Sequence, residues 1–260
     1  MGILDGKHIL ITGVLTDASL AFATARLAQE QGAEVVLSGA GRGLNLTKRT
    51  ARKLDKPVEV LEIDVSEPEQ LKNAGIELAK RWDRLDGLLH AIGYAPSNCL
   101  GNGMFKAGWE DVSVALNISS YSLKALVEAF RPLLTEAGHG AGASIVSLDF
   151  DATLAWPFYD WMGVAKAALE SLSRYLAKEL GPDGIRVNLL TAGPIRTMAG
   201  KSIPGFDEFG EVWQKRAPLG WDVTETECVA KAAVALLSDW FPMTTGESVH
   251  VDGGFHAVGC

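Results

Sequence analysis

Short runs of apolar and β-branched residues alternate with longer segments of helical spacing along almost the whole chain. The segment 19–32, for example, repeats apolar residues on one helical face and ends at Gly32, a residue type that commonly terminates helices. The short runs have the length and composition of buried parallel strands and lie at residues 8–12, 34–38, 58–64, 87–92, 144–148, 185–191 and 247–251. This alternation predicts an α/β fold with a doubly wound, seven-stranded parallel sheet and helices on both faces.

The chain of 260 residues is long enough for one large domain or two small ones. Hydrophobic residues make up 47% of the sequence and the prolines are scattered, so no low-complexity linker divides it. We therefore expect a single domain over residues 1–260.

The net charge of −8 argues against a general nucleic-acid binder, because such proteins usually carry a basic surface stripe. The cysteines Cys99, Cys228 and Cys260 are odd in number and lack the spacing of metal ligands. No apolar run approaches the roughly 20 residues that a helix needs to span a membrane. We expect a cytoplasmic protein with no metal site and with neither nucleic acid nor membrane as a partner.

Right-handed crossovers place the carboxyl ends of parallel strands at one edge of the sheet, where ligands bind. The first loop at this edge begins at Gly13, which permits a tight turn, and reaches Ser19, which can cap the next helix. Free amide groups at that helix start would bind a pyrophosphate. The loop lacks the further glycines of GxGxxG, so a plain turn is an equally good interpretation. The glycine-rich stretch 39–43 has a different spacing and follows the second strand, where such folds place the adenosine ribose.

Two positions bear on the choice of cofactor. After the second strand the chain has no carboxylate for a ribose 2′-hydroxyl but has Arg42, which favours the 2′-phosphate of NADPH. An arginine there can also stack on adenine or lie in solvent. After the third strand, Asp64 and Val65 can contact the adenine edge, or Asp64 can cap the helix that begins near Pro68.

Glycines recur at the carboxyl ends of the strands. Gly13 follows the first strand, Gly93 the fourth and Gly193 the sixth. Because a glycine lets the backbone approach a ligand closely, these positions together predict one dinucleotide-binding crevice.

Several motifs together resemble those of a known family. They are the GxxxxxSxA loop (Gly13, Ser19, Ala21), Ile92-Gly93, Asp149-Phe150, Tyr159 with Lys166, GPIRT at 193–197 and VDGG at 251–254. Over essentially its whole length the chain resembles the bacterial enoyl-acyl-carrier-protein reductases, a divergent branch of the short-chain dehydrogenase/reductases. Within that branch it is most similar to the actinobacterial type that isoniazid targets. The resemblance implies a single-domain Rossmann fold.

The seven-residue step from Tyr159 to Lys166 separates this branch from typical superfamily members, which carry the lysine four residues after the tyrosine. Seven helical residues cover about 10.5 Å and return to nearly the same face, whereas four cover about 6 Å. In a ketone reductase, charge develops on the oxygen bonded to the carbon that accepts the hydride. In an enoyl thioester it develops on the thioester oxygen, further along the conjugated chain, so the acidic hydroxyl should stand farther from the nicotinamide ribose.

The resemblance implies hydride transfer from NADH, with NADPH possible, to trans-2-enoyl thioesters of acyl-carrier protein or CoA in type II fatty-acid synthesis. It implies that Tyr159 hydrogen-bonds the enolate oxygen, that Lys166 holds the nicotinamide ribose, and that Phe150 and Met162 line the substrate site. The other cofactor-binding positions that it implies are Gly13, Ser19, Leu20, Asp64, Val65, Ile92, Gly93, Ile195 and Thr197. Proteins of this family are usually tetrameric, so a homotetramer is expected.

A segment at about 196–217 covers the acyl chain in this family, and it is shorter here than in the long-chain-specific actinobacterial enzyme. Its length favours ordinary or medium acyl chains. Most aromatic residues of a protein lie in its core or interfaces, but six here are candidates to line an acyl tunnel: Trp109, Trp156, Trp161, Phe206, Phe209 and Trp213.

Two other functions stay open on the sequence. Asn117 stands where typical short-chain carbonyl reductases have a proton-relay asparagine, which favours a carbonyl or 3-oxoacyl thioester reductase. Against this reading, Gly163 occupies the position four residues after Tyr159 where that chemistry requires lysine. The third reading is a non-catalytic cofactor-binding protein with a resistance or regulatory role.

Overall fold

The computed structural model describes residues 2–140 and 142–259, so Met1, Ala141 and Cys260 lie outside the described residues. One parallel sheet has the strand order β3-β2-β1-β4-β5-β6-β7. Its strands are β1 (His8–Ile11), β2 (Glu34–Gly39), β3 (Glu59–Glu62), β4 (Gly87–His90), β5 (Ala143–Asp149), β6 (Ile185–Ala192) and β7 (Ser248–Val251). Each predicted run coincides with one strand, and the ends differ by at most two residues. The predicted seven-stranded, doubly wound sheet is therefore confirmed.

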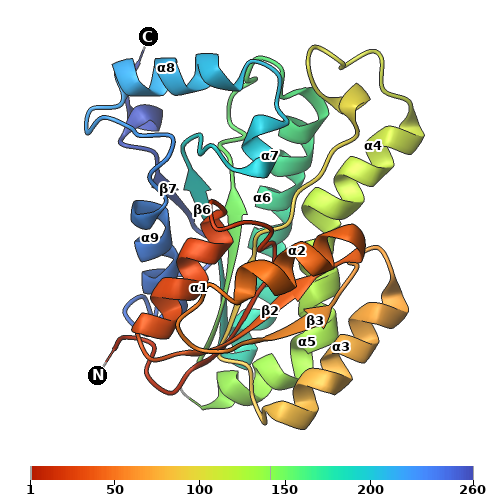
Figure 1. Cartoon of the computed structure of the whole chain (residues 1–260), viewed down its shortest axis with the longest axis vertical. Helices are drawn as coiled ribbons and strands as arrows, with labels where there is room; N and C mark the ends of the chain where they lie inside the picture. Colours follow the sequence, from red (N-terminus) through yellow and green to blue (C-terminus); the bar gives the residue numbers. More distant parts are fainter. Residues whose placement is uncertain (1, 141, 260) are drawn as a thin grey trace.

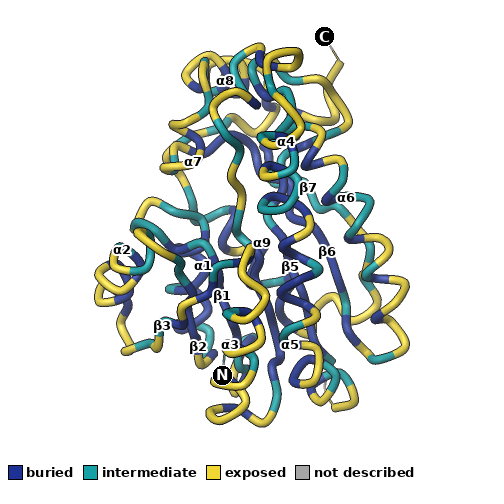
Figure 2. The backbone as a smooth tube through the Cα atoms, turned by 90° about the vertical axis from the view of Figure 1, so that its right-hand side faces the viewer, coloured by how far each residue is buried: buried dark blue, intermediate teal, exposed yellow. Residues whose placement is uncertain are grey.

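Helices cover both faces of the sheet (Figure 1). One apolar cluster joins the sheet to α1 (Leu20–Glu30), α2 (Gly41–Ala51) and α9 (Glu227–Leu237). A second cluster joins the opposite face to α3 (Pro68–Arg81), α5 (Ser122–His139) and α6 (Asp160–Leu180). Figure 2 shows the buried strands between these two layers. None of the helices in the described ranges is both long enough and apolar enough to cross a membrane.

The predicted local signals around α1 are present in the structure. Ser19 is the N-cap, and its hydroxyl oxygen accepts a hydrogen bond from the amide of Phe22 at 3.2 Å. After the helix, Gly32 has a φ of +96°, which a side chain would disfavour. The buried face of α1 packs against α9. These contacts fix the start of α1 directly above the end of β1.

Additional helices lie beyond the carboxyl ends of the strands. They are α4 (Trp109–Leu116), α7 (Met198–Lys201) and α8 (Phe206–Arg216), at the upper end of the molecule in Figure 1. A π-helix at Asn117–Tyr121 leads from α4 into α5, and single 3₁₀ turns at Ser97–Cys99 and Phe255–Ala257 follow β4 and β7, whereas the turn at Gly181–Asp183 precedes β6 at the opposite edge. The carboxyl edge of the sheet is thus enclosed by added segments.

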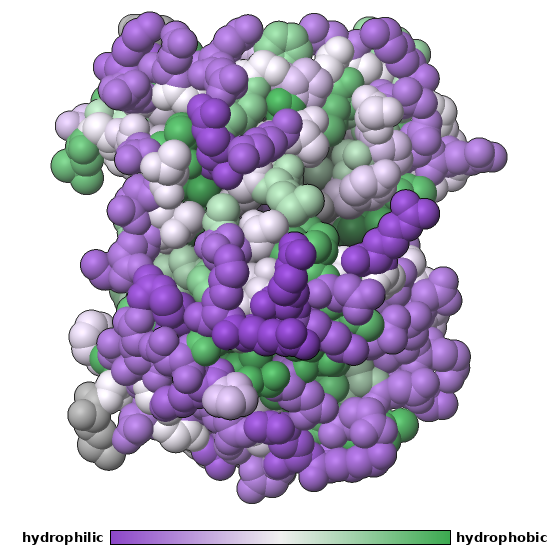
Figure 3. Space-filling model, viewed as in Figure 1, coloured by the Kyte–Doolittle hydropathy of each residue, from purple (hydrophilic) through white to green (hydrophobic). Residues whose placement is uncertain are grey.

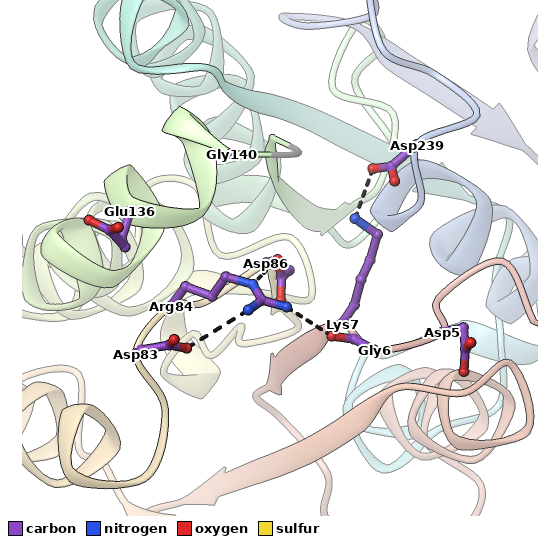
Figure 4. A pocket seen from close by; sticks show the side chains of 9 residues that line it. All are labelled: Asp5, Gly6, Lys7, Asp83, Arg84, Asp86, Glu136, Gly140 and Asp239. Atoms are coloured by element: carbon purple, nitrogen blue, oxygen red, sulfur yellow. Dashed lines mark hydrogen bonds and ion pairs between the residues drawn. The ribbon is translucent and has the colours of Figure 1, made fainter.

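The amino ends of the strands border a smaller cavity of about 470 Å³ (Figure 4). Several of its charged side chains pair with one another. Lys7 Nζ lies 2.8 Å from Asp239, and Arg84 Nε lies 3.0 Å from the buried Asp86. Asp86 also accepts a hydrogen bond from the amide of His8 at 2.8 Å. This end of the sheet is therefore closed by internal polar contacts.

Candidate active site

The carboxyl edge of the sheet contains the larger cavity, a crevice of about 970 Å³. Figure 3 shows apolar residues, in green, gathered in the hollowed middle of the molecule between more polar upper and lower parts. Every residue proposed for the site from the sequence lines this one crevice: Gly13, Ser19, Leu20, Asp64, Val65, Ile92, Gly93, Phe150, Tyr159, Met162, Lys166, Ile195 and Thr197. The fold thus brings together positions that are distant in the sequence.

The loop after β1 is a tight turn that approaches the end of β4. Gly13 has a φ of +79°, and a Cβ atom there would lie 2.0 Å from the carbonyl oxygen of Ala91. No other residue fits this position. Beyond the turn, the amino end of α1 borders the crevice through Ser19, Leu20 and Ala21. A helix start of this kind is suited to a pyrophosphate because its first amide groups have no partner within the helix.

The crevice continues past the ends of β2 and β3. Ser38, Gly39 and Ala40 line it, whereas Arg42 is an exposed residue of α2 and is not among the lining residues. Asp64 lines it as well, and its carboxylate accepts hydrogen bonds from the amide and hydroxyl of Ser66, at 3.0 and 2.6 Å.

The alternative role of Asp64 as a helix cap is wrong. Helix α3 begins at Pro68 with Glu67 at its N-cap position. Asp64 instead closes a short turn with Ser66 at the edge of the crevice.

Tyr159 is buried and immediately precedes α6. The residues on either side, Phe158 and Asp160, have φ values of 63° and 39°, a left-handed region that is unfavourable for most side chains. The chain before α4 holds this conformation, because the amide of Gly101 donates to Phe158 O at 2.9 Å and the amide of Gly103 donates to Asp160 Oδ2 at 2.8 Å. Strain that is fixed by surrounding contacts is typical of functional positions.

Lys166 is buried two turns into α6 and contacts the end of β5. Its Nζ donates to the carbonyl oxygen of Leu148 at 2.8 Å and lies 3.7 Å from Asp149 Oδ1. Burial lowers the pKa of Lys166, while the same low-polarity surroundings raise that of Asp149 to about 7. Burial, assisted by the charge of Asp149, also raises the pKa of Tyr159, so its hydroxyl stays protonated and can donate a hydrogen bond.

Phe150 forms an aromatic wall beside Tyr159. The two rings meet edge to face with centroids 5.1 Å apart. Of the six aromatic residues considered for an acyl tunnel, Phe206 and Phe209 line the crevice. Trp156 and Trp213 pack against Phe150, with centroids 5.5 and 5.8 Å from it, and are not lining residues.

The other two aromatic candidates lie elsewhere. Trp109 is 74% exposed at the start of α4. Trp161 packs against the small cluster around Cys99 and donates its indole N–H to Met104 O at 3.0 Å. The sequence did not separate these positions because aromatic residues serve equally well in cores, walls and surfaces.

A buried polar network that the sequence did not suggest supports the loop after β4. His90 Nε2 lies 2.9 Å from Ser122 Oγ, and its Nδ1 lies 2.7 Å from Ser147 Oγ. Because Ser122 donates its proton to Ile118 O at 2.6 Å, we assign the Nε2 proton to His90. Burial lowers the pKa of His90 to about 3, so the ring is neutral.

The π-helix adds a second tie to the same loop. Ser119 Oγ accepts from the amide of Tyr94 at 2.9 Å and donates to its carbonyl oxygen at 2.8 Å. The loop with Ile92 and Gly93 is therefore held from two sides. Histidine and serine are common core residues, so the sequence offered no signal for these contacts.

The segment at 196–217 contains α7 and α8. Thr197 caps α7 by accepting from the amide of Gly200 at 3.0 Å, and Arg196 reaches Asp207 of α8 at 2.8 Å. Met198 and Phe206 from this segment line the crevice. The cap contact leaves the hydroxyl proton of Thr197 free to donate elsewhere.

Two residues, Asn117 and Gly163, bear on the alternative of a carbonyl reductase, and the structure shows where each lies. Asn117 begins the π-helix, and its neighbour Ile118, not Asn117 itself, is among the described lining residues. Gly163 lies one turn after Tyr159, where a Cβ atom would contact the tyrosine ring at 3.5 Å.

The described residues contain no group of three His, Cys, Asp or Glu side chains placed to hold a metal ion.

The sheet is doubly wound and parallel, with a glycine turn at β1, and its crevice is faced by a tyrosine just before α6 and a lysine within that helix. These features define a nucleotide-dependent oxidoreductase of the short-chain dehydrogenase/reductase class. A family model described as enoyl-(acyl carrier protein) reductase matches residues 13–256. The chain belongs to this family, as the sequence motifs indicated.

Curated relatives extend over the whole chain. An NADH enoyl-acyl-carrier-protein reductase from Mycolicibacterium smegmatis is 46% identical, and the alignment covers 97% of each chain. The NADH enzyme from Aquifex aeolicus is 39% identical over 100% of this chain and 94% of its own. An NADPH enzyme from Staphylococcus aureus is 35% identical over 98% of each chain.

Proposed function

We propose that this protein reduces trans-2-enoyl thioesters to saturated acyl thioesters with NADH, in type II fatty-acid synthesis. The observation that carries the proposal is the placement of Tyr159 and Lys166, seven residues apart, on one crevice beside the glycine turn of β1. The family match and the names of the relatives support the same reaction.

The residues along the crevice fit a nicotinamide dinucleotide. The start of α1 suits the pyrophosphate, and the ends of β2 and β3, with Asp64 and Val65, suit the adenosine. Gly93 has open space at the place of a side chain, with only Ser119 Oγ near, at 3.9 Å. Lys166, Ile195 and Thr197 border the nicotinamide end.

NADH is the proposed cofactor in preference to NADPH. Arg42, which by itself favoured a 2′-phosphate, is exposed and does not line the crevice. The relatives from Mycolicibacterium and Aquifex are named as NADH enzymes, whereas the one from Staphylococcus is named as an NADPH enzyme.

When bound, the nicotinamide supplies a hydride to C3 of the enoyl group, and a proton taken up at C2 completes the saturated acyl thioester. Tyr159 donates a hydrogen bond to the thioester oxygen, where negative charge develops; one such donor contributes about 3 kcal/mol in well-studied oxyanion holes. Lys166 donates to the ribose hydroxyls and adds positive charge. Phe150 and Met162 exclude water from the reacting double bond, since both line the crevice beside Tyr159.

The same proposal covers the domain organisation of the protein, the carrier of its substrate and its oligomeric state. Residues 1–260 act as one domain in which α7 and α8, within 196–217, cover the acyl chain. The substrate is delivered on acyl-carrier protein or CoA, and the protein acts as a homotetramer in the cytoplasm, without nucleic-acid or membrane partners.

Turnover assays test the reaction directly. The purified protein is incubated with NADH or NADPH and with either a trans-2-enoyl or a 3-oxoacyl thioester, and the absorbance of the reduced cofactor is followed. We expect oxidation of NADH with the enoyl substrate. Oxidation only with the 3-oxoacyl substrate would establish the carbonyl-reductase alternative, and cofactor binding without turnover of either would establish the non-catalytic one.

A further inference from the structure

The carboxylate of Asp149 is buried beside the crevice without a hydrogen-bond partner. Asp149 is the last residue of β5, and its side chain has no exposed surface. Neither carboxylate oxygen accepts a hydrogen bond from a described residue, and the Lys166 ammonium lies 3.7 Å from Oδ1. A buried carboxylate is normally paired or hydrogen-bonded, so this position calls for an explanation.

The groups near Asp149 come from α6, the segment just before it, and two neighbouring strands. Helix α6 contributes Lys166 and Glu170, and Tyr159 lies just before it. Strand β4 contributes the neutral His90, which lies on the far side of Lys166 and is paired with Ser147 of β5. Across β6, Asp149 is paired with Thr191, whose hydroxyl is engaged with Ser248 at 2.7 Å. Among the described groups that face Asp149, Lys166 alone can be positively charged.

We propose that Asp149 acts on the reaction through Lys166: its negative charge keeps that lysine cationic, and it adds to the burial that keeps Tyr159 protonated. The inference rests on the proposed function, because it concerns the two side chains that act on the substrate and the cofactor. It assigns a role to a residue that does not itself touch the reacting atoms.

The sign of the effect is the same for both neighbours. A negative charge favours the protonated ammonium of Lys166 and disfavours the ionised phenolate of Tyr159. It therefore raises the pKa of each group, which is the direction in which Asp149 acts on both. Without it, burial would promote loss of the lysine proton, and the crevice would lose a donor to the ribose.

The effect comes from charge and not from holding the lysine in place. Lys166 Nζ is already fixed by its 2.8 Å hydrogen bond to the carbonyl oxygen of Leu148, and a change at position 149 keeps that backbone acceptor. Asp149→Asn has the same shape as the native side chain but carries no charge. It should therefore change the proton affinity of Lys166 while leaving its position intact.

Asp151 provides a matched control two residues further on. It is also buried, but its carboxylate accepts hydrogen bonds from the amide and hydroxyl of Thr153, at 2.9 and 2.6 Å. An asparagine oxygen can accept the same bonds. Asp151→Asn therefore removes a nearby charge from the loop that follows β5 without affecting a partner of Lys166.

The test compares the pH dependence of kcat/KM for enoyl reduction in the native protein, Asp149→Asn and Asp151→Asn. The alkaline limb should move to lower pH by about one unit in Asp149→Asn, since an opposite charge at this distance shifts a pKa by about 1–3 units. The profiles of native protein and Asp149→Asn should converge below neutral pH, and Asp151→Asn should follow the native profile. An unmoved limb in Asp149→Asn, or an equal shift in both variants, overturns the proposal.

A second readout does not require turnover. The dissociation constant of NADH, followed by quenching of tryptophan fluorescence, should increase at a lower pH in Asp149→Asn than in the native protein, and identical curves would overturn the proposal. If the native protein binds NADH but reduces no enoyl thioester, the proposed function fails while this comparison still decides the role of Asp149. If Asp149→Asn does not fold, Asp149→Ser removes the same charge with less volume, and the same two comparisons apply.

Discussion

The two ends of the sheet have cavities of opposite character. At the amino ends, Lys7, Arg84 and Asp86 form ion pairs and hydrogen bonds with neighbouring residues, so the polar groups satisfy one another. At the carboxyl ends, Lys166 and Asp149 are buried 3.7 Å apart, and the carboxylate has no hydrogen-bond partner among the described residues. At one end of the sheet these polar side chains are thus paired within the protein, and at the other end a buried carboxylate lacks a hydrogen bond.

This difference shows how the fold separates stability from chemistry. Polar groups that are satisfied within the protein have little free energy to gain from a ligand. Groups whose protonation is perturbed by burial can exchange interactions with a substrate or cofactor, and such groups cluster at functional sites. Substitutions at the two ends should therefore affect different properties.

The largest effect is expected at the carboxyl end, from Tyr159→Phe. Loss of the hydroxyl removes the hydrogen bond to the developing oxyanion, so kcat for enoyl reduction should fall about 10²–10³-fold. NADH binding should change little, because the ring and its contact with Phe150 remain. Steady-state kinetics and a fluorescence titration measure the two quantities, and unaffected turnover would exclude Tyr159 as the oxyanion donor.

Asp149→Asn should change stability in a pH-dependent way. Burial raises the pKa of Asp149 from its ordinary 3.8 to about 7, so its contribution to stability is complete below pH 3.8 and decreases as the pH rises through about 7. The variant lacks this titration. Relative to the native protein, its free energy of unfolding should therefore increase by about 2 kcal/mol between about pH 5 and about pH 7.

Urea unfolding at the two pH values measures this difference. Asp151→Asn is again the control, and its stability relative to the native protein should be nearly constant over the same range. A constant difference for Asp149→Asn as well would mean that the carboxylate is not destabilised by its burial.

At the amino end, Asp86→Ala should reduce stability and leave chemistry unchanged. The substitution leaves the half-buried amide of His8 without an acceptor and Arg84 without its 3.0 Å partner, at a cost of about 1.5 kcal/mol. Asp83, which is 82% exposed and 3.9 Å from Arg84, gives a control that should change stability by less than about 0.5 kcal/mol. A drop in kcat for Asp86→Ala would contradict the separation of the two ends.

The smallest effect is expected from Lys7→Met at the same end. The methionine keeps the apolar stem but loses the ion pair with Asp239, whose side chain is 55% exposed. Solvent weakens such a pair, so unfolding should become easier by less than about 1 kcal/mol, and the difference should shrink at high salt. A larger loss in the free energy of unfolding that does not depend on salt would show that the Lys7–Asp239 pair stabilises the fold more than its solvent exposure suggests.

Features with a local cause were predictable. Ser19 was expected to cap α1 and does so, because a serine before an apolar helical pattern satisfies the first free amides. The strands were found from their apolar runs, and their ends differ from the predicted ones by at most two residues in either direction. Tyr159 and Lys166 were expected to face one crevice, and both line it, although Tyr159 lies just before α6 and the following Asp160 has a left-handed φ, so a regular helical repeat does not relate the two.

Features with a distant cause were not predictable from the same patterns. Nothing near Phe158 in the sequence indicates a left-handed backbone, which is held by the remote amide of Gly101. Asp149 was part of a motif, but its pairing with Lys166 depends on how α6 packs against β5. An aspartate at the carboxyl end of a central strand was the one signal that could have suggested it.

The sequence by itself determined the succession of strands and helices along the chain and the edge of the sheet that holds the site, because periodicity and turn chemistry act over a few residues. Its motifs, through the family resemblance, pointed to the tyrosine and lysine that face this edge. The tertiary structure decided which aromatic side chains line the crevice, which backbone is strained and which charges are buried together. Those outcomes depend on packing and desolvation summed over segments distant in the chain, so the physical environment of Asp149 and Tyr159 exists only in the folded molecule.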